Sequence, residues 1–323
     1  MVFETTTSCN LRCLHCGTWR EAPDPQALST EEWLRLLREL RRWIGPFQLS
    51  FSRGETLLDA GTLAIVREAA GLGVMTTCVS NGTLIDPEMA LRLRDSRLGT
   101  LVLSIDGMSA ATHDYGRGAP GTHAKACEAA RAVRGTQGGP AVRVSAIVAG
   151  HNLEELEALV RWTAGEGLEG VHFQALQRDG HAWRRLWPRD RTRLDAALDR
   201  LVALKRAGSA ILNSEAQLEA MRGYFRDPDA PHPELLCNTF TRLSVGARGD
   251  VSFCTFKEPI GNVREQGIGA IWGSAAARER FEDILGCKKS CLLLNCNFRP
   301  SLRSSAEALW RHMAARAAQA RAS

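Results

Sequence analysis

Three cysteines stand close together near the start of the chain, in the stretch TTTSCNLRCLHCGTW (residues 5–19). Cys9, Cys13 and Cys16 are separated by three and then two residues, so one loop can direct three thiolates at a single metal centre. A structural zinc site is closed by four ligands, whereas a cluster with three protein thiolates leaves one iron open to another ligand. Because His15 could be a fourth zinc ligand, the spacing leaves zinc and iron–sulfur chemistry both open.

Five further cysteines gather near the end of the chain: Cys237, Cys254, Cys287, Cys291 and Cys296. Gly249 and Asp250 stand between two apolar stretches and predict a hairpin turn, so that Cys237 and Cys254 flank the two strands of a small ribbon. Four of the five thiolates can hold one further iron–sulfur cluster or one structural zinc ion. One cysteine is then left over.

The composition indicates a globular protein outside the membrane. Of the 323 residues, 44% are hydrophobic and 24% are charged, and no apolar run approaches the ~20 residues that cross a bilayer. The first residues, MVFETTTSCN, have neither the basic nor the apolar region of a targeting peptide, so we expect a cytoplasmic location. In that reducing compartment ten cysteines favour metal binding or catalysis over disulfides.

The net charge of +5 comes mostly from residues 299–323, which hold five arginines and one glutamate. Elsewhere basic and acidic residues are interleaved, a pattern that does not support a surface following nucleic-acid phosphates. We therefore expect no nucleic-acid partner, and we interpret the basic tail as the solvated face of a helix.

Strand-like and helix-like patterns alternate regularly up to about residue 175. The expected strands are 2–7, 47–52, 73–80, 99–105, 141–149 and 170–176, and the expected helices are 29–44, 59–73, 86–96, 121–135 and 152–167. Ser29, Asp86 and Asn152 are the expected helix caps. The alternation predicts an α/β fold with a parallel sheet, either doubly wound or an incomplete barrel. In both, ligands bind at the carboxyl ends of the strands, where the first cysteine loop falls.

The same patterns divide the chain into four segments: a core (1–180), a linker (181–236), a cysteine-rich domain (237–300) and a C-terminal helix (301–323). The linker is expected to carry a helix at 191–207 before its Pro- and Asp-rich end. The cysteine-rich domain is expected to carry a helix at 260–272.

The stretch CNLRCLHC (9–16) resembles the signature of the radical S-adenosylmethionine (radical SAM) superfamily. The resemblance implies a partial (β/α)6 TIM-like barrel and a [4Fe–4S] cluster bound by Cys9, Cys13 and Cys16. It further implies that the amino and carboxylate groups of S-adenosylmethionine chelate the fourth iron, with His15 near the adenine.

A second segment of that resemblance follows the expected second strand. Arg53-Gly54-Glu55-Thr56 stands where the superfamily has Gly-Gly-Glu-Pro, whose backbone holds the methionine amino group. The resemblance therefore implies cofactor binding at Gly54 and Glu55. Arg53 departs from the pattern, because it brings a Cβ atom and a charge where close backbone approach is expected.

Two more segments, VSNGTLI (79–85) and LSIDG (103–107), resemble the family after the third and fourth strands. The residues that they would bring to the cofactor are Ser80, Asn81, Ser104 and Asp106, the last two near the ribose. Asn-Gly and Asp-Gly pairs are also ordinary turn sequences, and their shared place at strand ends is what favours the cofactor role.

The second cysteine group resembles the C-terminal auxiliary-cluster domain called SPASM, or twitch in its shortened form. A full SPASM domain holds two auxiliary clusters and needs more than the five cysteines of this group, so the resemblance implies one auxiliary [4Fe–4S] cluster. Its expected ligands are Cys237 and Cys254 with two of Cys287, Cys291 and Cys296.

In this superfamily the reduced cluster splits S-adenosylmethionine, and a 5′-deoxyadenosyl radical abstracts a substrate hydrogen; an electron donor such as flavodoxin or ferredoxin is implied. Oxidation through the auxiliary cluster would give dehydrogenation, whereas hydrogen return from a thiol would give epimerisation. The candidate hydrogen donors are Cys78, Cys254 and Cys287, and more remotely Cys127. For Cys78 and Cys127 a buried apolar role is the alternative.

The cysteine motif begins at residue 9, with no peptide-recognition domain before it, which favours a small-molecule substrate: a sugar or aminocyclitol of secondary metabolism, as in antibiotic biosynthesis. Modification of a ribosomally made peptide is the alternative, and a non-catalytic iron–sulfur or zinc protein is the second alternative. Polar candidates for the substrate cleft are Asp106, His172, Gln174 and Gln177.

Overall fold

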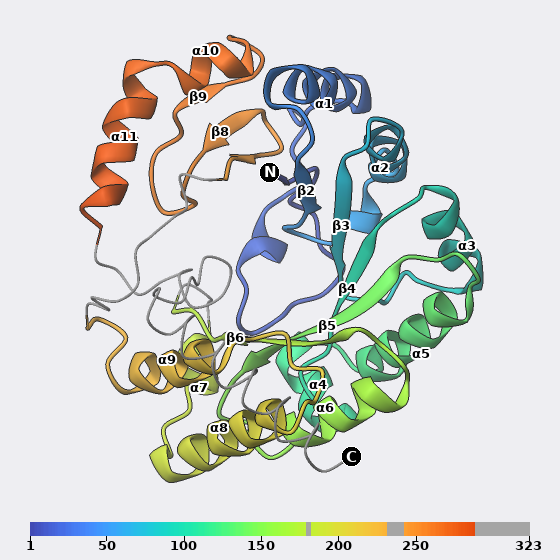
Figure 1. The fold of residues 1–323 in the computed structure, drawn as a ribbon, viewed down its shortest axis with the longest axis vertical. Helices are drawn as coiled ribbons and strands as arrows, with labels where there is room; N and C mark the ends of the chain where they lie inside the picture. The colour runs from blue at the N-terminus through green and yellow to red at the C-terminus, as the bar shows by residue number, and fades with distance from the viewer. Residues whose placement is uncertain (179–181, 231–241, 288–323) are drawn as a thin grey trace, which may run out of the picture.

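The computed structural model describes residues 1–178, 182–230 and 242–287, and Figure 1 shows its strands curving around the segment that follows the first strand. Six parallel strands lie side by side in chain order: β1 (Val2–Phe3), β2 (Gln48–Phe51), β3 (Met75–Ser80), β4 (Thr100–Ser104), β5 (Ala141–Val148) and β6 (Gly170–Ala175). Each lies within a stretch predicted as a strand. The fold is therefore the expected α/β partial barrel, not an open doubly wound sheet.

The five predicted helices of the core are present and follow the strands as crossovers. They are α1 (Thr30–Ile44), α2 (Thr62–Gly71), α3 (Pro87–Asp95), α5 (Thr122–Gly135) and α6 (Leu156–Gly165). Ser29 caps α1 in a capping box with Glu32, and Asp86 caps α3. Asn152 is not a cap, because α6 begins at Leu156; its side chain has a different task, described below.

Alternate strand residues face the helices and form the hydrophobic core. Phe51 on β2, Cys78 on β3 and Leu101 on β4 stand side by side in register, and all are 0% exposed. Their neighbours along each strand point to the opposite side of the sheet and are less buried. That opposite side is the lumen of the partial barrel.

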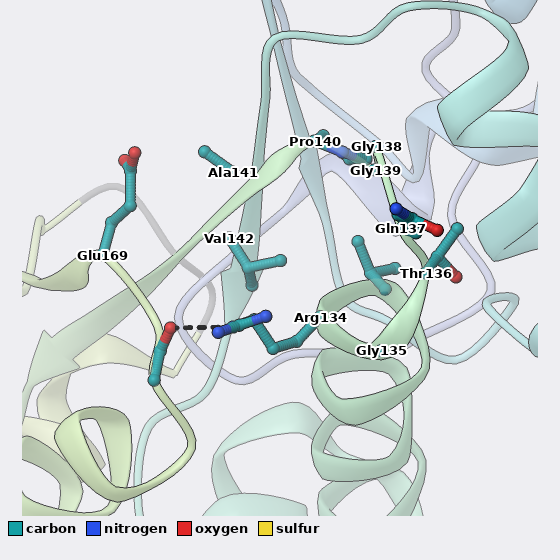
Figure 2. Close-up of a pocket in the computed structure, with 12 residues that line it drawn as sticks. Arg134, Gly135, Thr136, Gln137, Gly138, Gly139, Pro140, Ala141, Val142 and Glu169 are labelled. Atoms are coloured by element: carbon teal, nitrogen blue, oxygen red, sulfur yellow. Dashed lines mark hydrogen bonds between the residues drawn. The ribbon is translucent and has the colours of Figure 1, made fainter.

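The amino ends of β5 and β6 border a hollow of about 780 Å³ (Figure 2). It is lined by the turn from Arg134 to Val142 and by Gly167 and Glu169, and the Arg134 Nε atom donates to the Gly167 carbonyl at 3.1 Å. Ligands of βα barrels bind at the opposite, carboxyl ends of the strands. We therefore assign this hollow no part in the site.

Residues 182–230, predicted as a linker, pack closely against the barrel. They form α7 (Trp183–Leu186), α8 (Arg191–Arg206) and α9 (Glu215–Arg226), and between the last two Ile211 forms a parallel bridge with Val171 of β6. The predicted helix 191–207 is confirmed by α8. Helix α9 was not predicted; its apolar face, including Met221 and Phe225, is fully buried.

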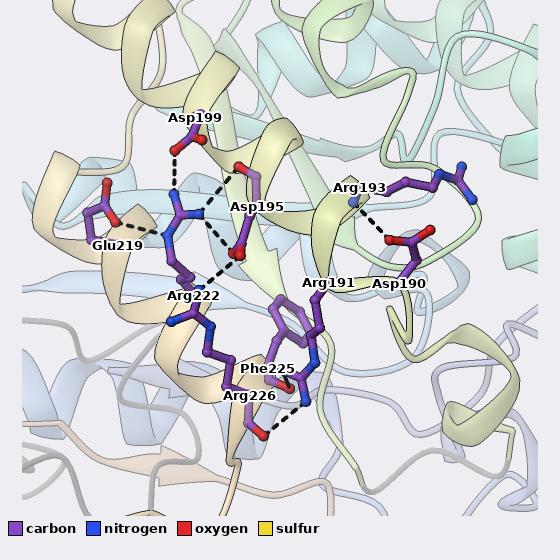
Figure 3. Close-up of polar contacts among 9 residues, drawn as sticks. All are labelled: Asp190, Arg191, Arg193, Asp195, Asp199, Glu219, Arg222, Phe225 and Arg226. Carbon is purple, nitrogen blue, oxygen red and sulfur yellow. Dashed lines mark hydrogen bonds and ion pairs between the residues drawn. The ribbon is translucent and has the colours of Figure 1, made fainter.

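Arg222 on α9 joins the two linker helices (Figure 3). Its guanidinium pairs with Asp195 at 2.8 Å and Asp199 at 2.6 Å on α8, and with Glu219 at 3.2 Å on its own helix. The side chain is 16% exposed, so solvent screens these pairs less than ordinary surface pairs.

We expect Arg222→Leu to lower the free energy of unfolding by about 1–2 kcal/mol, because three carboxylates lose a shared partner. Urea denaturation at low and high salt is the measurement, and the loss should shrink in high salt. Arg35→Leu on the exposed face of α1 is the control, with an expected effect below about 0.5 kcal/mol. Equal losses in both variants would contradict the assignment.

The C-terminal part extends the same sheet. Strands β7 (Ser244–Val245), β8 (Asp250–Ser252) and β9 (Gly261–Asn262) follow β1 in the sheet order, with β7 parallel to β1 and the other two antiparallel to their neighbours. The predicted hairpin is present, and Gly249 has the positive φ of 92° that its turn requires.

The prediction of one helix over 260–272 is wrong in its first half. The Ile260 amide donates to the Val251 carbonyl across the ribbon, at 2.7 Å, and the chain then forms β9 from Gly261 onward. Helix α10 covers only Ile268–Trp272 and is followed by α11 (Ala275–Leu285). Cys237, Cys291, Cys296 and the predicted helix within 301–323 lie outside the described residues. Among the helices of the described part, none has the length and apolarity that crossing a bilayer requires.

Candidate active site

The loop after β1, residues 8–17, carries the first three cysteines and is fastened to several parts of the barrel. The Ser8 carbonyl accepts from the Glu55 amide at 2.8 Å, beyond the end of β2. The Leu14 amide donates to Gly116 at 2.9 Å, and the Leu14 carbonyl accepts from Ala182 at 3.2 Å. The loop thus spans the carboxyl ends of the strands, as predicted.

The three thiols of this loop lie within electrostatic range of one another. Cys13 is buried, while Cys9 and Cys16 are half-buried. Burial raises the pKa of Cys9, and it raises that of Cys13 to about 11, so in the absence of a metal these thiols stay protonated at neutral pH. No three His, Cys, Asp or Glu side chains of the described part stand at metal-binding spacing. The donor set itself, three thiols on one loop with half-buried sulfurs, fits an iron–sulfur cluster with one open iron.

Gly54 lies directly against this loop. Its φ is 62°, and a Cβ atom there would stand 2.4 Å from the Ser8 carbonyl oxygen. Arg53, beside it, has a φ of 78° although it is not glycine, so the chain keeps the backbone shape of a Gly-Gly pair with an arginine at the first position. Its guanidinium turns outward to Glu21 at 2.6 Å and to Glu4 at 3.6 Å. The charge of Arg53 is thus neutralised beside the loop.

We expect Gly54→Ala to cut cluster incorporation several-fold, because the added methyl group must displace Ser8 next to Cys9. Iron and sulfide content after anaerobic reconstitution is the measurement. Gly73→Ala is the matched control, since Gly73 has a similar φ of 70° but nothing within 4 Å of the added atom. If both variants lost iron equally, the cause would be backbone strain alone and not the contact with Ser8.

The side chain of Glu55 organises the ends of β2 and β3. It is 1% exposed, and its carboxylate accepts from the Ser80 hydroxyl and the Asn81 amide, both at 2.8 Å, and from the Leu57 amide at 3.2 Å. Burial raises the pKa of Glu55, and these hydrogen bonds offset part of that rise. Three residues predicted from the sequence therefore form one polar cluster.

Asn81 connects this cluster to the cysteine loop. Its side-chain Nδ2 donates to the Asn10 side-chain oxygen at 2.8 Å, and the Asn10 Nδ2 donates to the Thr83 hydroxyl at 2.8 Å. Asn10 follows Cys9, so these bonds fix the loop between its first two cysteines. Asn10 was not predicted as a site residue, although an Asn between two ligand cysteines is a signal that could have found it.

Asp106 forms a buried ion pair that the sequence did not reveal. Its carboxylate lies 2.8 Å from Arg117 Nε and accepts from the Ile147 amide at 2.9 Å, and both charged side chains are less than 10% exposed. Burial raises the pKa of Asp106, but Arg117, the nearby histidines and the Ile147 amide together outweigh this and lower it to about 2. The guanidinium also hydrogen-bonds the Cys13 thiol. Asp106 therefore acts on the cysteine loop through Arg117, and its carboxylate oxygens already have partners.

Arg117 belongs to α4 (Ala110–Arg117), a helix that was not predicted. The Glu155 carboxylate holds its amino end, accepting from the Ser109 amide at 2.9 Å and from the Ser109 hydroxyl at 2.6 Å. At its carboxyl end, Gly118 has a φ of 70° and a Cβ atom there would lie 2.3 Å from the Arg12 carbonyl oxygen. This close approach seats α4 against the cysteine loop.

Asn152, predicted as a helix cap, instead connects the ends of β4 and β5 near Asp106. Its side-chain nitrogen donates to the carbonyls of Asp106 and Ile147, both at 2.7 Å. His15 is half-buried beside this group; burial and then Arg117 lower its pKa to about 4, so its imidazole is neutral at pH 7. A neutral ring can pack against an adenine, the role that the resemblance implies.

Polar side chains of β4 to β6 face the lumen. Ser104 pairs in register with Ser145, whose hydroxyl accepts from Gln174 Nε2 at 3.0 Å. His172 contacts Gln217 of α9, with 3.4 Å between their Nε2 atoms. Ser104, Ser145, His172 and Gln174 thus form a polar, uncharged floor of the lumen toward the carboxyl ends of these strands. Arg143, two residues before Ser145 on the same side of β5, pairs with Glu169 at 2.6 Å near the amino ends of the strands.

Two of the candidate hydrogen donors lie away from the lumen. Cys78 is 0% exposed on the helix-facing side of β3, and burial strongly raises its pKa. Cys127 is buried on α5 with its sulfur 3.6 Å from His123 Nε2. Both positions are those of small apolar core residues.

Cys254 and Cys287, the described members of the second cysteine group, flank one ion pair. The Cys254 sulfur accepts from the Phe256 amide at 3.4 Å, and Lys257 then reaches Asp283 on α11 at 2.6 Å. Cys287 comes after Gly286, the residue that ends α11, and it lies within electrostatic range of Lys257. Both cysteines are half-buried, as ligands of an auxiliary cluster need to be.

Comparison with protein families agrees with this geometry. The model of the radical SAM superfamily matches residues 3–163, and that of the iron–sulfur cluster-binding SPASM domain matches residues 237–297. The chain belongs to the radical SAM superfamily. As a radical SAM enzyme with a SPASM domain, it uses a [4Fe–4S] cluster, S-adenosylmethionine and an auxiliary iron–sulfur cluster.

Individual proteins resemble this radical SAM enzyme to different extents. It is 25% identical to the AdoMet-dependent heme synthase of Methanosarcina barkeri, over 90% of this chain and 86% of the relative. It is 35% identical to the PqqA peptide cyclase of Rhodopseudomonas palustris, over 42% of this chain and 36% of the relative. Against other curated relatives it spans only about half of their length or less. The solved structure of anSMEcpe with bound AdoMet and Cp18Cys peptide has the same fold, with a TM-score of 0.69, 16% identity and coverage of 91% of this chain and 86% of that one.

Proposed function

We propose that this radical SAM enzyme modifies a peptide. The observation that carries the proposal is the uncharged polar floor of the lumen, where Ser145, His172 and Gln174 offer both donors and acceptors. Peptide N–H and C=O groups need partners of both kinds when they leave water. The 35% identity to a peptide cyclase over 42% of this chain supports the same substrate class.

The residues of the cysteine loop have distinct tasks in this proposal. Cys9, Cys13 and Cys16 hold the cluster, and the Gly54 backbone gives the cofactor close access beside Ser8. When bound, the cluster and S-adenosylmethionine supply a radical that removes a substrate hydrogen. Glu55 and Asn81 hold the loop in place, and Arg117 sets a fixed positive charge beside Cys13.

The SPASM part supplies the electron acceptor. We assign Cys254 and Cys287 to the auxiliary cluster together with cysteines outside the described residues, within the proposed domain 237–300. An acceptor there favours net oxidation of the peptide over epimerisation, since Cys78 and Cys127 face away from the lumen. A one-electron donor such as flavodoxin or ferredoxin reduces the first cluster.

A second candidate is heme synthesis, favoured by the match that extends over 86% of the M. barkeri heme synthase. A sugar or aminocyclitol, the substrate class favoured from the sequence, has no support from the relatives described above. The three classes differ in what the lumen must bind, so they can be compared in one assay.

The test uses anaerobically reconstituted protein with S-adenosylmethionine and a strong reductant. Parallel reactions receive a library of short synthetic peptides, a carboxylated tetrapyrrole, or an aminocyclitol. We expect the peptides to raise 5′-deoxyadenosine formation above the substrate-free rate and to lose two hydrogens in mass. A response to the tetrapyrrole or the aminocyclitol alone would overturn the proposal.

A further inference from the structure

A cavity of about 560 Å³ opens beside the cysteine loop, and four arginines line it: Arg184, Arg185, Arg189 and Arg193. All four are exposed, and among the lining residues they face a single carboxylate, that of Asp190. A volume of this size is typical of ligand sites. So many guanidinium groups around one hollow are unfavourable unless anions offset their mutual repulsion.

The charged groups around the cavity leave part of this positive potential uncompensated. Asp190 is occupied as the cap of α8, accepting from the Arg193 amide at 3.0 Å, while the Arg193 guanidinium extends away from it (Figure 3). Glu154 pairs with Arg193 at 2.9 Å. Arg184 lies over the Trp183 ring at 4.7 Å, and Arg185 has no ion pair with any described residue. The amino end of the 16-residue helix α8 adds its partial positive charge.

The shape of the cavity suits an extended chain better than one compact anion. Its arginines come from α7, from the turn before α8 and from α8 itself, so they are spread over three segments. Tyr115 and Trp187 also line the cavity and can cover apolar groups between the charges. Guanidinium groups bind carboxylates in pairs of parallel hydrogen bonds, which gives each arginine one acidic side chain to hold.

The cavity also borders the radical site. Tyr115 precedes Gly116, whose carbonyl holds the Leu14 amide at 2.9 Å, and α7 follows Ala182, whose amide holds the Leu14 carbonyl at 3.2 Å. Both walls are thus attached to the residue between Cys13 and His15. The cavity lining also includes Gly150 and His151, which follow the carboxyl end of β5.

We propose that this arginine-lined cavity binds an acidic segment of the peptide substrate, several Asp or Glu residues away from the position that is modified. The inference rests on the proposed function, because it names the recognition element of that peptide. It adds a binding site outside the lumen and predicts that acidic peptides are preferred.

The test is binding of a fluorescein-labelled peptide with six glutamates to the reconstituted protein, with a six-glutamine peptide as reference. We expect the acidic peptide to bind, to weaken with added salt, and to lose affinity by about tenfold or more in the double variant Arg184→Glu/Arg185→Glu. The matched control is Arg35→Glu/Arg92→Glu, which changes the net charge equally at exposed arginines of α1 and α3 and should bind as the unaltered protein does.

Equal loss of binding in both double variants would overturn the proposal, because the attraction would then be general to the surface. Displacement of the acidic peptide by low inorganic phosphate, or tighter binding of a carboxylated tetrapyrrole that needs the same two arginines, would also overturn it. The proposed function is tested apart from this, since neutral peptides can still raise 5′-deoxyadenosine formation in the Arg184→Glu/Arg185→Glu protein. If neutral peptides raise 5′-deoxyadenosine formation while the acidic peptide does not bind the unaltered protein, the cavity assignment is wrong and the proposed function stands.

Discussion

Cys13→Ala protein is expected to form no 5′-deoxyadenosine above background and to carry about four irons fewer than the unaltered protein. Cys13 is the most buried of the three loop cysteines and is the one that Arg117 contacts, so its loss removes a cluster ligand and one of the groups that the guanidinium contacts. Iron counting after anaerobic reconstitution and chromatography of the nucleoside product are the measurements.

Cys127→Ala is the matched control, because Cys127 is equally buried but lies on α5 beside His123. We expect it to keep its iron and its activity, with at most a small loss of stability. Full iron content and activity in Cys13→Ala would show that the loop cysteines do not hold the cluster.

Asp106→Asn is expected to lower the free energy of unfolding by about 3–5 kcal/mol, because it leaves the buried Arg117 without a counter-charge. Since the pKa of Asp106 lies at about 2 in the folded protein, below its usual value near 3.9, the stability that its charge contributes is present above about pH 4 and is lost as the pH falls toward 2. Denaturant unfolding at pH 7 is the measurement.

Asp95→Asn is the control for this prediction, since Asp95 pairs with Arg94 at 2.7 Å on the surface and is 53% exposed. We expect a change below about 1 kcal/mol there. A similar small change in Asp106→Asn would mean that water reaches Arg117 and that the pair does not hold α4 to the cysteine loop.

The sequence allowed the barrel to be predicted nearly element by element, because each strand alternates or runs apolar and each crossover helix has apolar residues at helical spacing. It did not reveal α4. Its sequence, AATHDYGR, has no continuous apolar stripe, and its buried face contains His113 and Arg117. Arg117 can be buried there only because Asp106, which lies outside the helix, neutralises its charge. Ser109 before the helix and Gly118 after it were the signals present.

The strand β7 could not have been predicted to join β1. Each contributes only two residues to the pairing, Val2 and Phe3 with Ser244 and Val245. Two residues are too few for the alternation of apolar and polar side chains to predict which strands pair. Their pairing depends on the hairpin at Gly249 and on Arg264, which bonds to Glu32 at 2.7 Å on α1. The cysteine-rich part is thereby fixed to the barrel through contacts between distant segments.

The site residues divide in a similar way. Ser80, Asn81 and Glu55 were predicted because each lies at the end of a strand within a segment that resembles the family; the structure brings them together, and their binding of the cofactor stays a prediction. Asn10, Asn152 and Glu155 were not predicted as site residues, because their tasks are to bond backbone groups of other loops, and only the folded chain shows which loops those are.

The proposal that a peptide is the substrate is tested most directly by following one hydrogen atom. Reconstituted protein is incubated with S-adenosylmethionine, reductant and a responding peptide that is deuterated at its carbon-bound positions, and the 5′-deoxyadenosine product is analysed by mass spectrometry. We predict that deuterium from the peptide appears in the nucleoside, and that it is absent in the Cys13→Ala protein. Product that is formed at the same rate without peptide, and that carries no deuterium when the peptide is present, would contradict the proposal that a peptide is the substrate.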